Sequence, residues 1–342
     1  MLAELTLSEW DILLRQAYCA ELSGRLAELA QTHALWSGIP EGPRRQLASA
    51  AALADKVGRE VRWEVACIRR ALADVVEDLI LLKGAAYVMA ALPPARGRIF
   101  HDVDILVPRD KLDQVESALL FGGWASVYTD PYDQRYYRQW MHELPPMRHI
   151  ERSAVLDVHH TILPLTARLR PDADRLRAAA IALPDHDGIK VLAPADMILH
   201  AAAHLFYDGD FMRGLRDLSD LDALLRHFGS REGFWPMLLT QARVHDLMRP
   251  LFYAVRYAAT LLETPIPADV SQEIQAISRP NLATLHALDW LLARVLRPDH
   301  PTCRLTGTGL ARQVLYVRSH WLRMPSPLLA RHLFHKAFIS KH

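Results

Sequence analysis

The stretch "RGRIFHDVDILVP", residues 96–108, places two aspartates inside a run that otherwise has the composition of a buried strand. Because strand side chains alternate between faces, Asp102 and Asp104 share one face, while the valines and isoleucine around them share the other. Two like charges on one face repel, and a divalent cation or a basic neighbour is the usual compensation. Mg²⁺ prefers carboxylate oxygens, commonly together with substrate phosphates. A strand end whose aspartates are simply solvated also explains an isolated D-x-D. Other parts of the chain must therefore show whether this motif is a cation site.

Composition describes an ordinary soluble globular protein. The chain has 342 residues, of which 51% are hydrophobic, and a formal net charge of +1. This length allows two domains, or one core with helical additions, and the near-neutral charge argues against disorder and against a nucleic-acid-coating surface. Cys19, Cys67 and Cys303 are far apart and form no C-x-x-C pair. We therefore expect neither a disulfide framework nor a zinc ribbon, and a reducing cytoplasm as the compartment.

The sequence also predicts no membrane insertion. The N-terminal residues lack a basic leader before an apolar run, so we expect no signal peptide. Uninterrupted apolar runs stay shorter than a membrane-spanning helix requires. Our expectation is a cytoplasmic protein without a transmembrane segment.

Periodicity predicts an α+β fold, in which a small mixed β-sheet core lies between helical regions. We expect an N-terminal helical region over 1–76, an α/β core over 77–165 and a C-terminal helical domain with a basic tail over 166–342. Within the core, short apolar runs bounded by Gly and Pro predict strands, and Gly122-Gly123 ends an amphipathic helix. The predicted elements are a helix over about 46–76, a strand over 79–82, a helix over 85–91, the D-x-D strand, a helix starting near 109, an irregular aromatic stretch over 128–142, and a hairpin with its second strand at 155–160.

A third acid lies in the second strand of that hairpin. In "AVLDVHH", residues 154–160, Asp157 is surrounded by apolar residues. Three carboxylates can hold two Mg²⁺ ions, or Mn²⁺, and such a pair stabilises both the attacking and the leaving oxygen of a phosphoryl displacement. Lys83 and Gly84 follow an earlier strand, and they fit the same chemistry because glycine lets backbone N–H groups approach a phosphate and lysine adds a positive charge. Arg98 has the reach to contact a triphosphate or to pair with an aspartate.

The series "LLKGAAYVMAAL" (81–92), "RGRIFHDVDILV" (96–107) and "VLDVHH" (155–160) resembles the nucleotidyltransferase superfamily that includes DNA polymerase β. It looks closest to the bacterial group labelled uncharacterised nucleotidyltransferase family proteins. The resemblance covers roughly residues 78–162. It implies that Asp102 and Asp104 bind both metals, and that Asp157 binds the catalytic metal and helps to activate the incoming hydroxyl.

The resemblance also implies a nucleotide-binding set. Lys83 and Arg98 match the basic positions of the bacterial group, and the turn at Gly84 and Ala85 would hold the phosphates. The wider superfamily prefers Gly-Ser or Gly-Gly at this turn, so contacts here would depend on backbone N–H groups and Lys83. A weaker similarity continues in the segment 198–225. The positions that match the group there, and that are expected to line the cleft, are His204, Arg213 and Asp217.

Several other signals have both a functional and a structural explanation. His159 shares a face with Asp157 and either touches substrate or packs in the core, whereas His101 is expected to face away from Asp102. His200 and His204 are spaced for one helix face, but the third zinc ligand is not evident and structural histidines are favoured. The aromatic stretch over 128–142 fits an acceptor site or an edge that packs on the helices. The basic, amphipathic residues 304–341 fit contact with an anionic surface, RNA or acids elsewhere in the fold.

We therefore predict a Mg²⁺-dependent nucleotidyltransferase that moves NMP from an NTP to an acceptor and releases pyrophosphate. The acceptor is open: a small molecule, a peptide, a protein or an RNA end. Two alternatives remain. One is a catalytically inactive nucleotide-binding or scaffold protein of the same fold, and the other is a D-x-D glycosyltransferase, for which Asp157 would have no task.

Overall fold

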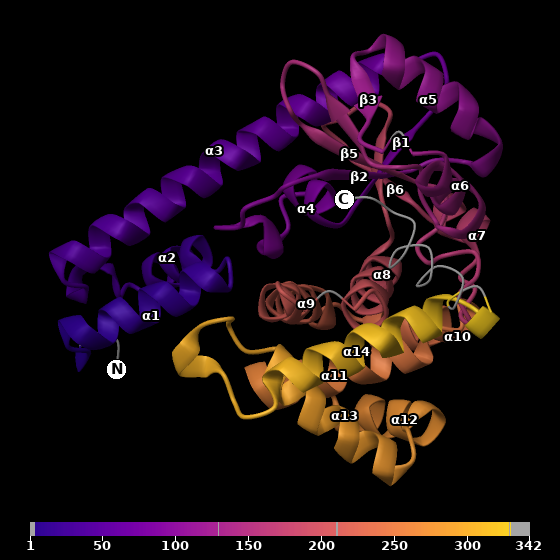
Figure 1. The fold of residues 1–342 in the computed structure, drawn as a ribbon. Coiled ribbons are helices and arrows are strands. Elements are labelled where there is room, and N and C mark those ends of the chain that lie inside the picture. Colours follow the sequence, from indigo (N-terminus) through magenta and orange to yellow (C-terminus); the bar gives the residue numbers. More distant parts are fainter. Residues whose placement is uncertain (1–3, 129, 210, 328, 330–342) are drawn as a thin grey trace.

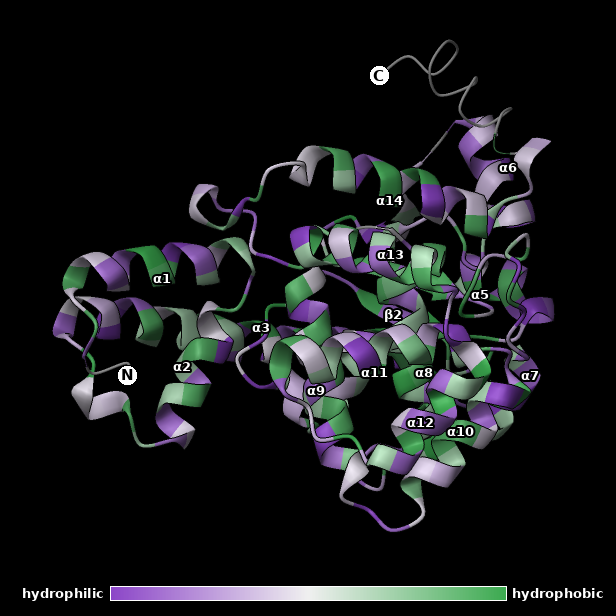
Figure 2. Ribbon diagram, turned by 90° about the horizontal axis from the view of Figure 1, so that it is seen from below, coloured by the Kyte–Doolittle hydropathy of each residue, from purple (hydrophilic) through white to green (hydrophobic). Residues whose placement is uncertain are grey.

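The computed structural model describes residues 4–128, 130–209, 211–327 and 329. Three helices open the chain and form an N-terminal lobe, made of α1, α2 and the first half of α3, with a small apolar core of its own that includes Trp10 and Leu47. A capping box at Thr6 and Glu9 starts the first helix. The lobe stands to one side of the remaining helices (Figures 1 and 2). The three helices are α1 (Leu7–Cys19), α2 (Ser23–Thr32) and α3 (Glu41–Ala71).

A seven-stranded mixed sheet forms the core, in the order β3-β4-β5-β2-β1-β7-β6. The three central strands carry the sequence motifs: β2 pairs antiparallel with β1 and parallel with β5. Apart from the partly buried Val155, the valine, isoleucine and leucine side chains on these strands are almost fully buried. The strands are β1 (Leu79–Leu82), β2 (Val103–Leu106), β3 (Trp124–Ser126), β4 (Met147–His149), β5 (Val155–His159), β6 (Ile181–Ala182) and β7 (Ile189–Val191).

The predicted α+β class, with N-terminal helices and a C-terminal helical region around a mixed sheet, is confirmed. The strand at 79–82 and the hairpin of β4 and β5 are also confirmed. The sheet nevertheless continues past residue 165, where mainly helices were expected, because β7 pairs in parallel with β1. A three-residue strand is too short to show a period of two against its surroundings, so periodicity alone missed it.

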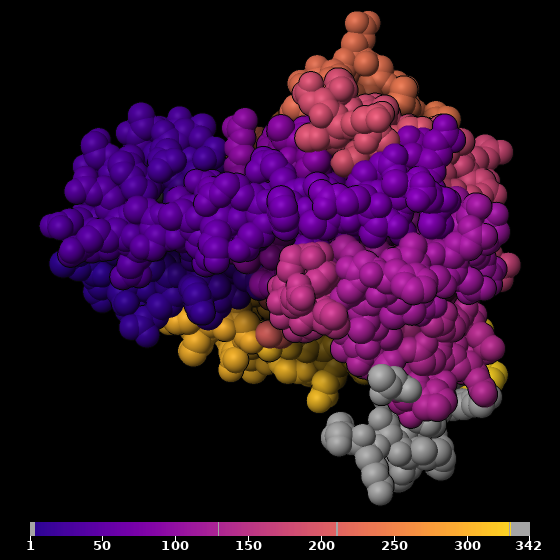
Figure 3. Space-filling view, turned by 90° about the horizontal axis from the view of Figure 1, so that it is seen from above, coloured from indigo at the N-terminus to yellow at the C-terminus, as the bar shows by residue number. Residues whose placement is uncertain are grey.

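Helices cover both faces of the sheet. The long helix α3 crosses one face and hides it in the space-filling view (Figure 3), while the helices from α8 onward form a layer on the other side (Figure 1). The remaining helices are α4 (Lys83–Met89), α5 (Leu112–Phe121), α6 (Pro131–Trp140), α7 (Ala173–Ala178), α8 (Pro194–Tyr207), α9 (Gly214–Gly229), α10 (Phe234–Val244), α11 (Met248–Leu262), α12 (Ala268–Ser278), α13 (Leu282–Val295) and α14 (Thr308–Arg323).

Two helical predictions need correction. The helix expected over 46–76 is α3, which spans Glu41–Ala71. It begins earlier than expected because a proline in the first turn of a helix needs no intrahelical donor, so Pro43 does not delay the start. The aromatic stretch expected to be irregular contains the helix α6. Its start is fixed by the Asp130 carboxylate, which accepts hydrogen bonds from the backbone N–H groups of Tyr132 and Asp133.

Within the described part of the chain, no helix is both long and apolar enough to cross a membrane. The basic residues of 304–341 fall into two groups. Arg304 and Arg312 pair with Asp299, Arg318 donates to the carbonyl of Phe206, and Arg323 pairs with Asp208. These four contacts favour the intramolecular role for this part of the region. Arg331, Lys336 and Lys341 lie outside the described residues.

Candidate active site

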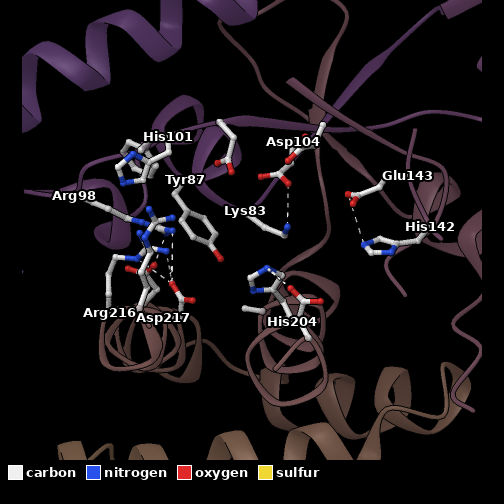
Figure 4. Close-up of a pocket in the computed structure, with 18 of the residues that line it drawn as sticks. Lys83, Tyr87, Arg98, His101, Asp104, His142, Glu143, His204, Arg216 and Asp217 are labelled. Carbon is white, nitrogen blue, oxygen red and sulfur yellow. Dashed lines mark hydrogen bonds and ion pairs between the residues drawn. The ribbon is translucent and has the colours of Figure 1, made fainter. Parts of the chain in front are cut away.

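A cavity of about 410 Å³ opens between the sheet and the helical layer of α8 and α9. Its size is that of an ordinary small-molecule site. It brings together segments far apart in the sequence: the start of α4, the residues before β2, the α6–β4 connection, α8, α9 and the end of α14. Figure 4 shows the side chains that line it. Of the predicted site residues, the cavity lining includes Lys83, Gly84, Arg98, Asp102, Asp104, Asp157, His204, Arg213 and Asp217.

The three aspartates meet at this cavity because of the sheet register. Asp104 on β2 lies directly opposite Asp157 on the parallel neighbour β5. Asp102 comes just before β2 and is exposed, Asp157 is partly buried, and Asp104 is only 3% exposed. The pairing of strands far apart in the sequence therefore gathers the carboxylates that the D-x-D motif and the later strand supplied separately.

Lys83 points at Asp104 (Figure 4). Its Nζ donates to Oδ1 of Asp104 at 2.9 Å, since Leu82, the residue before it, is the register partner of Asp104. The backbone of Lys83 has a φ of +41°, in the left-handed region that a side-chain-bearing residue seldom adopts. Burial disfavours the lysine charge, but Asp104 and Asp102 raise the pKa of Lys83. The lysine expected to bind phosphate is thus the counter-charge of an aspartate in this structure.

His159 supports Asp104 from the protein interior. Its Nε2 lies 3.0 Å from Oδ1 of Asp104, and the side chain is 1% exposed and does not line the cavity. Burial lowers the pKa of His159, so the neutral ring donates from Nε2. Burial opposes the charge of Asp104, but Lys83 and the hydrogen bond from His159 keep its pKa well below the usual range. Asp104 is therefore ionised and held by two donors.

Asp157 and Asp102 lack such compensation. Oδ1 of Asp157 is buried and accepts no hydrogen bond within the described part of the chain. Burial and the charges of Asp104 and Asp102 raise the pKa of Asp157 to about 7. Desolvation by the surrounding cavity walls and the charge of Asp104 likewise raise the pKa of Asp102. An unsatisfied carboxylate oxygen facing two further acids is the donor set that a hard divalent cation fits, so the residues present suit a magnesium site.

A second group lies beside the aspartates. His142, Glu143 and His159 bring one potential metal-ligand atom each to within 4.8 Å of one another. Oε2 of Glu143 is 3.4 Å from Nε2 of His159, and an isolated β-bridge joins the two residues. Burial and the charge of Asp157 raise the pKa of Glu143 well above its ordinary value. No local sequence pattern pointed to Glu143, which lies in the connection between α6 and β4 without a recognisable motif.

Gly84 lines the cavity, but a packing contact explains its identity. A Cβ at this position would lie 2.4 Å from Cδ1 of the Phe100 ring, closer than side-chain atoms can approach. The neighbour Ala85 is fully buried and does not line the cavity. The glycine is thus required by Phe100, and the predicted contact of Ala85 with nucleotide would be through its backbone.

Arg98 is held by acids from α9. It forms an ion pair with Asp220, and its Nη2 lies 3.9 Å from an oxygen of Asp217. Its guanidinium also lies over the rings of Phe100 and Tyr87, at 5.0 and 5.6 Å from their centroids. Asp220 is a buried partner of Arg98 in the cavity wall.

Two arginines and a histidine surround a glutamate of the N-terminal lobe. Glu21, in the turn between α1 and α2, is contacted by Arg213, Arg216 and His101. His101 lines the cavity, contrary to the expectation that it faces away. The sequence had marked Arg213 but neither Arg216 nor Glu21, because their proximity arises only when the lobe packs on α9.

His204 and the aromatic residues of α6 complete the wall. Nε2 of His204 lies 3.8 Å from an Asp208 oxygen, and burial lowers the pKa of this histidine. His200 is buried and does not line the cavity, and among the described residues the group close enough to share a metal is the one with Glu143. Tyr136 and Tyr137 line the far end, so part of the aromatic stretch does border the cavity.

Residues 6–263 match the protein family described as "Uncharacterised nucleotidyltransferase". The chain belongs to this family. The match includes every residue of the D-x-D strand, the strand of Asp157 and the helices α8 and α9. A search of curated proteins finds no match. Membership supports nucleotidyl transfer as the reaction class, and it favours that class over the D-x-D glycosyltransferase alternative.

Proposed function

We propose that this nucleotidyltransferase family member binds an NTP with Mg²⁺ in the cavity and transfers NMP to an acceptor with release of pyrophosphate. One observation carries the proposal. Asp102, Asp104 and Asp157 face a single cavity with more negative charge than Lys83 neutralises, and one oxygen of Asp157 has no donor among the residues that the structure describes. Such a set binds divalent cations, and the catalytic cations of phosphoryl transfer have this environment.

Asp102, Asp104 and Asp157 would hold the metal. When bound, Mg²⁺ would supply neutralisation of phosphate charge and favour ionisation of an attacking hydroxyl. His159 fixes the rotamer of Asp104 through its 3.0 Å hydrogen bond, which keeps one ligand oriented before any ligand binds. Lys83 balances Asp104 in the present structure, and a bound cation would leave its ammonium group available to phosphate oxygens.

The two sides of the cavity differ in charge, which suggests how substrates are oriented. Arg98, His101 and Arg216 lie on one side of the Lys83–Asp104 pair, and Glu143 with His142 lies on the other (Figure 4). The basic side suits the β- and γ-phosphates of the nucleotide. The opposite side, with a carboxylate and two tyrosines, suits the acceptor. In this arrangement an acceptor oxygen attacks the α-phosphorus as the bond to pyrophosphate breaks.

The test combines binding and transfer. Calorimetry with a nonhydrolysable analogue of each NTP, with and without Mg²⁺, should show metal-dependent binding of one or more nucleotides to the wild type. Asp104→Asn should remove the metal-dependent part. The matched control is Asp110→Asn, an exposed aspartate just after the same strand that does not line the cavity. It should bind like the wild type.

Transfer is followed with an α-labelled NTP and separate pools of small molecules, peptides, proteins and RNA. The active protein should label one pool and release pyrophosphate, and Asp157→Asn should lower that rate by about a hundredfold or more. Nucleotide binding without label transfer to any pool would support the inactive nucleotide-binding alternative. Absence of binding by any nucleotide would refute the proposed function.

A further inference from the structure

A single carboxylate of the N-terminal lobe is gripped by three donors of the cavity wall. Oε1 of Glu21 accepts from Nε of Arg213 at 2.9 Å, and Oε2 accepts from Nη1 of Arg216 at 2.6 Å. Nε2 of His101 lies 3.2 Å from both oxygens. These donors come from α9, from the residue before α9 and from the approach to β2. Separate segments thus converge on one anion.

The surroundings show that this is a built anion site. Arg216 is 7% exposed, and its other nitrogens donate to Asp217, which fixes the guanidinium with one edge turned to Glu21. Asp220 is in turn held by Arg98 and by Arg25. Guanidinium groups bind a phosphate with the same two-oxygen geometry that they use for a carboxylate. If Glu21 withdrew, Nε of Arg213 and Nη1 of Arg216 would be free to donate to the phosphate oxygens of a ligand in the cavity.

Glu21 occupies this position in a way that allows withdrawal. It lies in the short turn between α1 and α2 with a φ of +55°, so it is carried by a loop outside both the sheet core and the small core of the lobe. Arg213 is 41% exposed, and its role in the fold is confined to the cavity rim. A change at either residue removes little buried apolar surface.

We propose that Arg213, Arg216 and His101 form a polyphosphate subsite, which Glu21 fills when nucleotide is absent and which the terminal phosphates of an NTP take over. This inference rests on the proposed function for the identity of the ligand, and it deepens that function by assigning the phosphate end of the nucleotide. A site that the protein fills itself binds with an apparent affinity reduced by the fraction of time it is open. Removal of the Glu21 charge should therefore tighten binding.

The experiment uses inorganic tripolyphosphate without divalent metal, so that the aspartate cluster does not contribute attraction. Calorimetric titration of the full chain compares wild type, Glu21→Gln and Arg213→Gln. Glu28→Gln is the matched control, because Glu28 lies on α2 of the same lobe, pairs with Arg96 at 3.7 Å and does not line the cavity. Thermal unfolding of each variant checks that it is folded.

We expect Glu21→Gln to bind tripolyphosphate about tenfold more tightly than the wild type, Glu28→Gln to match the wild type, and Arg213→Gln to bind at least tenfold more weakly. If Glu21 had a purely structural role, the opposite is expected. Losing its contacts with Arg213, Arg216 and His101 would then loosen the packing of the lobe and leave the affinity for tripolyphosphate unchanged or reduced. Either of those results in folded Glu21→Gln overturns the proposal. If Glu21→Gln does not fold, Arg213→Gln decides, and unchanged affinity in that variant overturns the proposal.

The outcome is separable from that of the proposed function. Tripolyphosphate binding with the expected order of variants, but without binding of any NTP, would keep the subsite and reject the nucleotidyl-transfer chemistry. NTP transfer together with a tripolyphosphate affinity that is the same in the wild type and in Glu21→Gln would keep the chemistry and reject the subsite.

Discussion

The ion pair between Lys83 and Asp104 gives the sharpest test of how the site is held together. The change is Lys83→Met, which keeps the length of the side chain and removes its charge, together with Asp104→Asn and the double variant. Lys83 Nζ and Asp104 Oδ1 are 2.9 Å apart, and the two side chains are 20% and 4% exposed. The pair is therefore largely shielded from water, and removing one partner leaves the other charge uncompensated.

The size of the effect follows from this geometry. Two unit charges at this separation attract by about 6 kcal/mol at an effective dielectric constant of about 20. Part of that attraction offsets the desolvation that the pair suffers on burial, so breaking a buried pair typically costs about 3–5 kcal/mol. We expect each single variant to lose about 3 kcal/mol of unfolding free energy. The double variant should lose about the same amount, which gives a coupling energy of about 3 kcal/mol.

The assay is equilibrium urea unfolding of the four proteins, with the denaturant dependence checked to be the same in all of them. Added Mg²⁺ should raise the stability of Lys83→Met more than that of the wild type, because the three aspartates then lack their ammonium counter-charge. Additive losses, with a coupling energy within about 0.5 kcal/mol of zero, would refute the view that Lys83 compensates Asp104. Equal effects of Mg²⁺ on both proteins would contradict a cation site at these carboxylates.

Two further predictions concern residues outside the cavity. Asp196 is 1% exposed and burial raises its pKa to about 6, so the folded state holds the proton more tightly than the unfolded state between pH 4 and 6. The contribution of this group to the free energy of unfolding should fall by up to about 3 kcal/mol as pH rises through that window. Urea unfolding of the wild type and of Asp196→Asn at pH 4 to 7 measures this as a pH-dependent difference in their unfolding free energies. A difference that does not change with pH would contradict the prediction. A Cβ added at Gly24 would lie 2.3 Å from the carbonyl oxygen of Gly97. Gly24→Ala should therefore lower the free energy of unfolding by about 1–3 kcal/mol and speed amide hydrogen exchange in α1 and α2. Gly42→Ala in the same lobe, where no other atom lies within 4 Å of the new Cβ, should leave the unfolding free energy and the exchange rates unchanged. Equal stability and equal exchange rates in the two variants would disprove tight packing at Gly24.

Local patterns were enough to predict the elements that carry the aspartates. A few consecutive residues are enough to predict each of them: the apolar run of β1, the alternation around Asp102 and Asp104, and the hairpin around Asp157. A period of two decides which side chains share a face, so the sequence showed that the two aspartates of the motif face one way. It did not show that Asp157 lies opposite Asp104, because register between distant strands is a property of the folded sheet.

The same limit explains the residues that sequence analysis missed. Glu143, Arg216 and Glu21 occupy a connection, a helix and a turn with no distinctive local pattern. Glu143 and Arg216 line the cavity, and Glu21 contacts Arg216, only because the helical layer and the N-terminal lobe pack against the sheet. The role of Gly84 shows a related ambiguity. A glycine after a strand fits a phosphate turn, yet here the Phe100 ring occupies the space of its missing side chain.

Local sequence patterns were enough for the fold class, the D-x-D strand and the three acids, because side-chain alternation and apolar runs depend on neighbouring residues alone. Folding in three dimensions places Lys83 against Asp104, leaves one oxygen of Asp157 without a donor among the described residues, and brings Glu21 against Arg213 and Arg216 of the cavity wall. Those facts depend on charges from distant segments meeting in a site shielded from water, where pairing or its absence controls the energy.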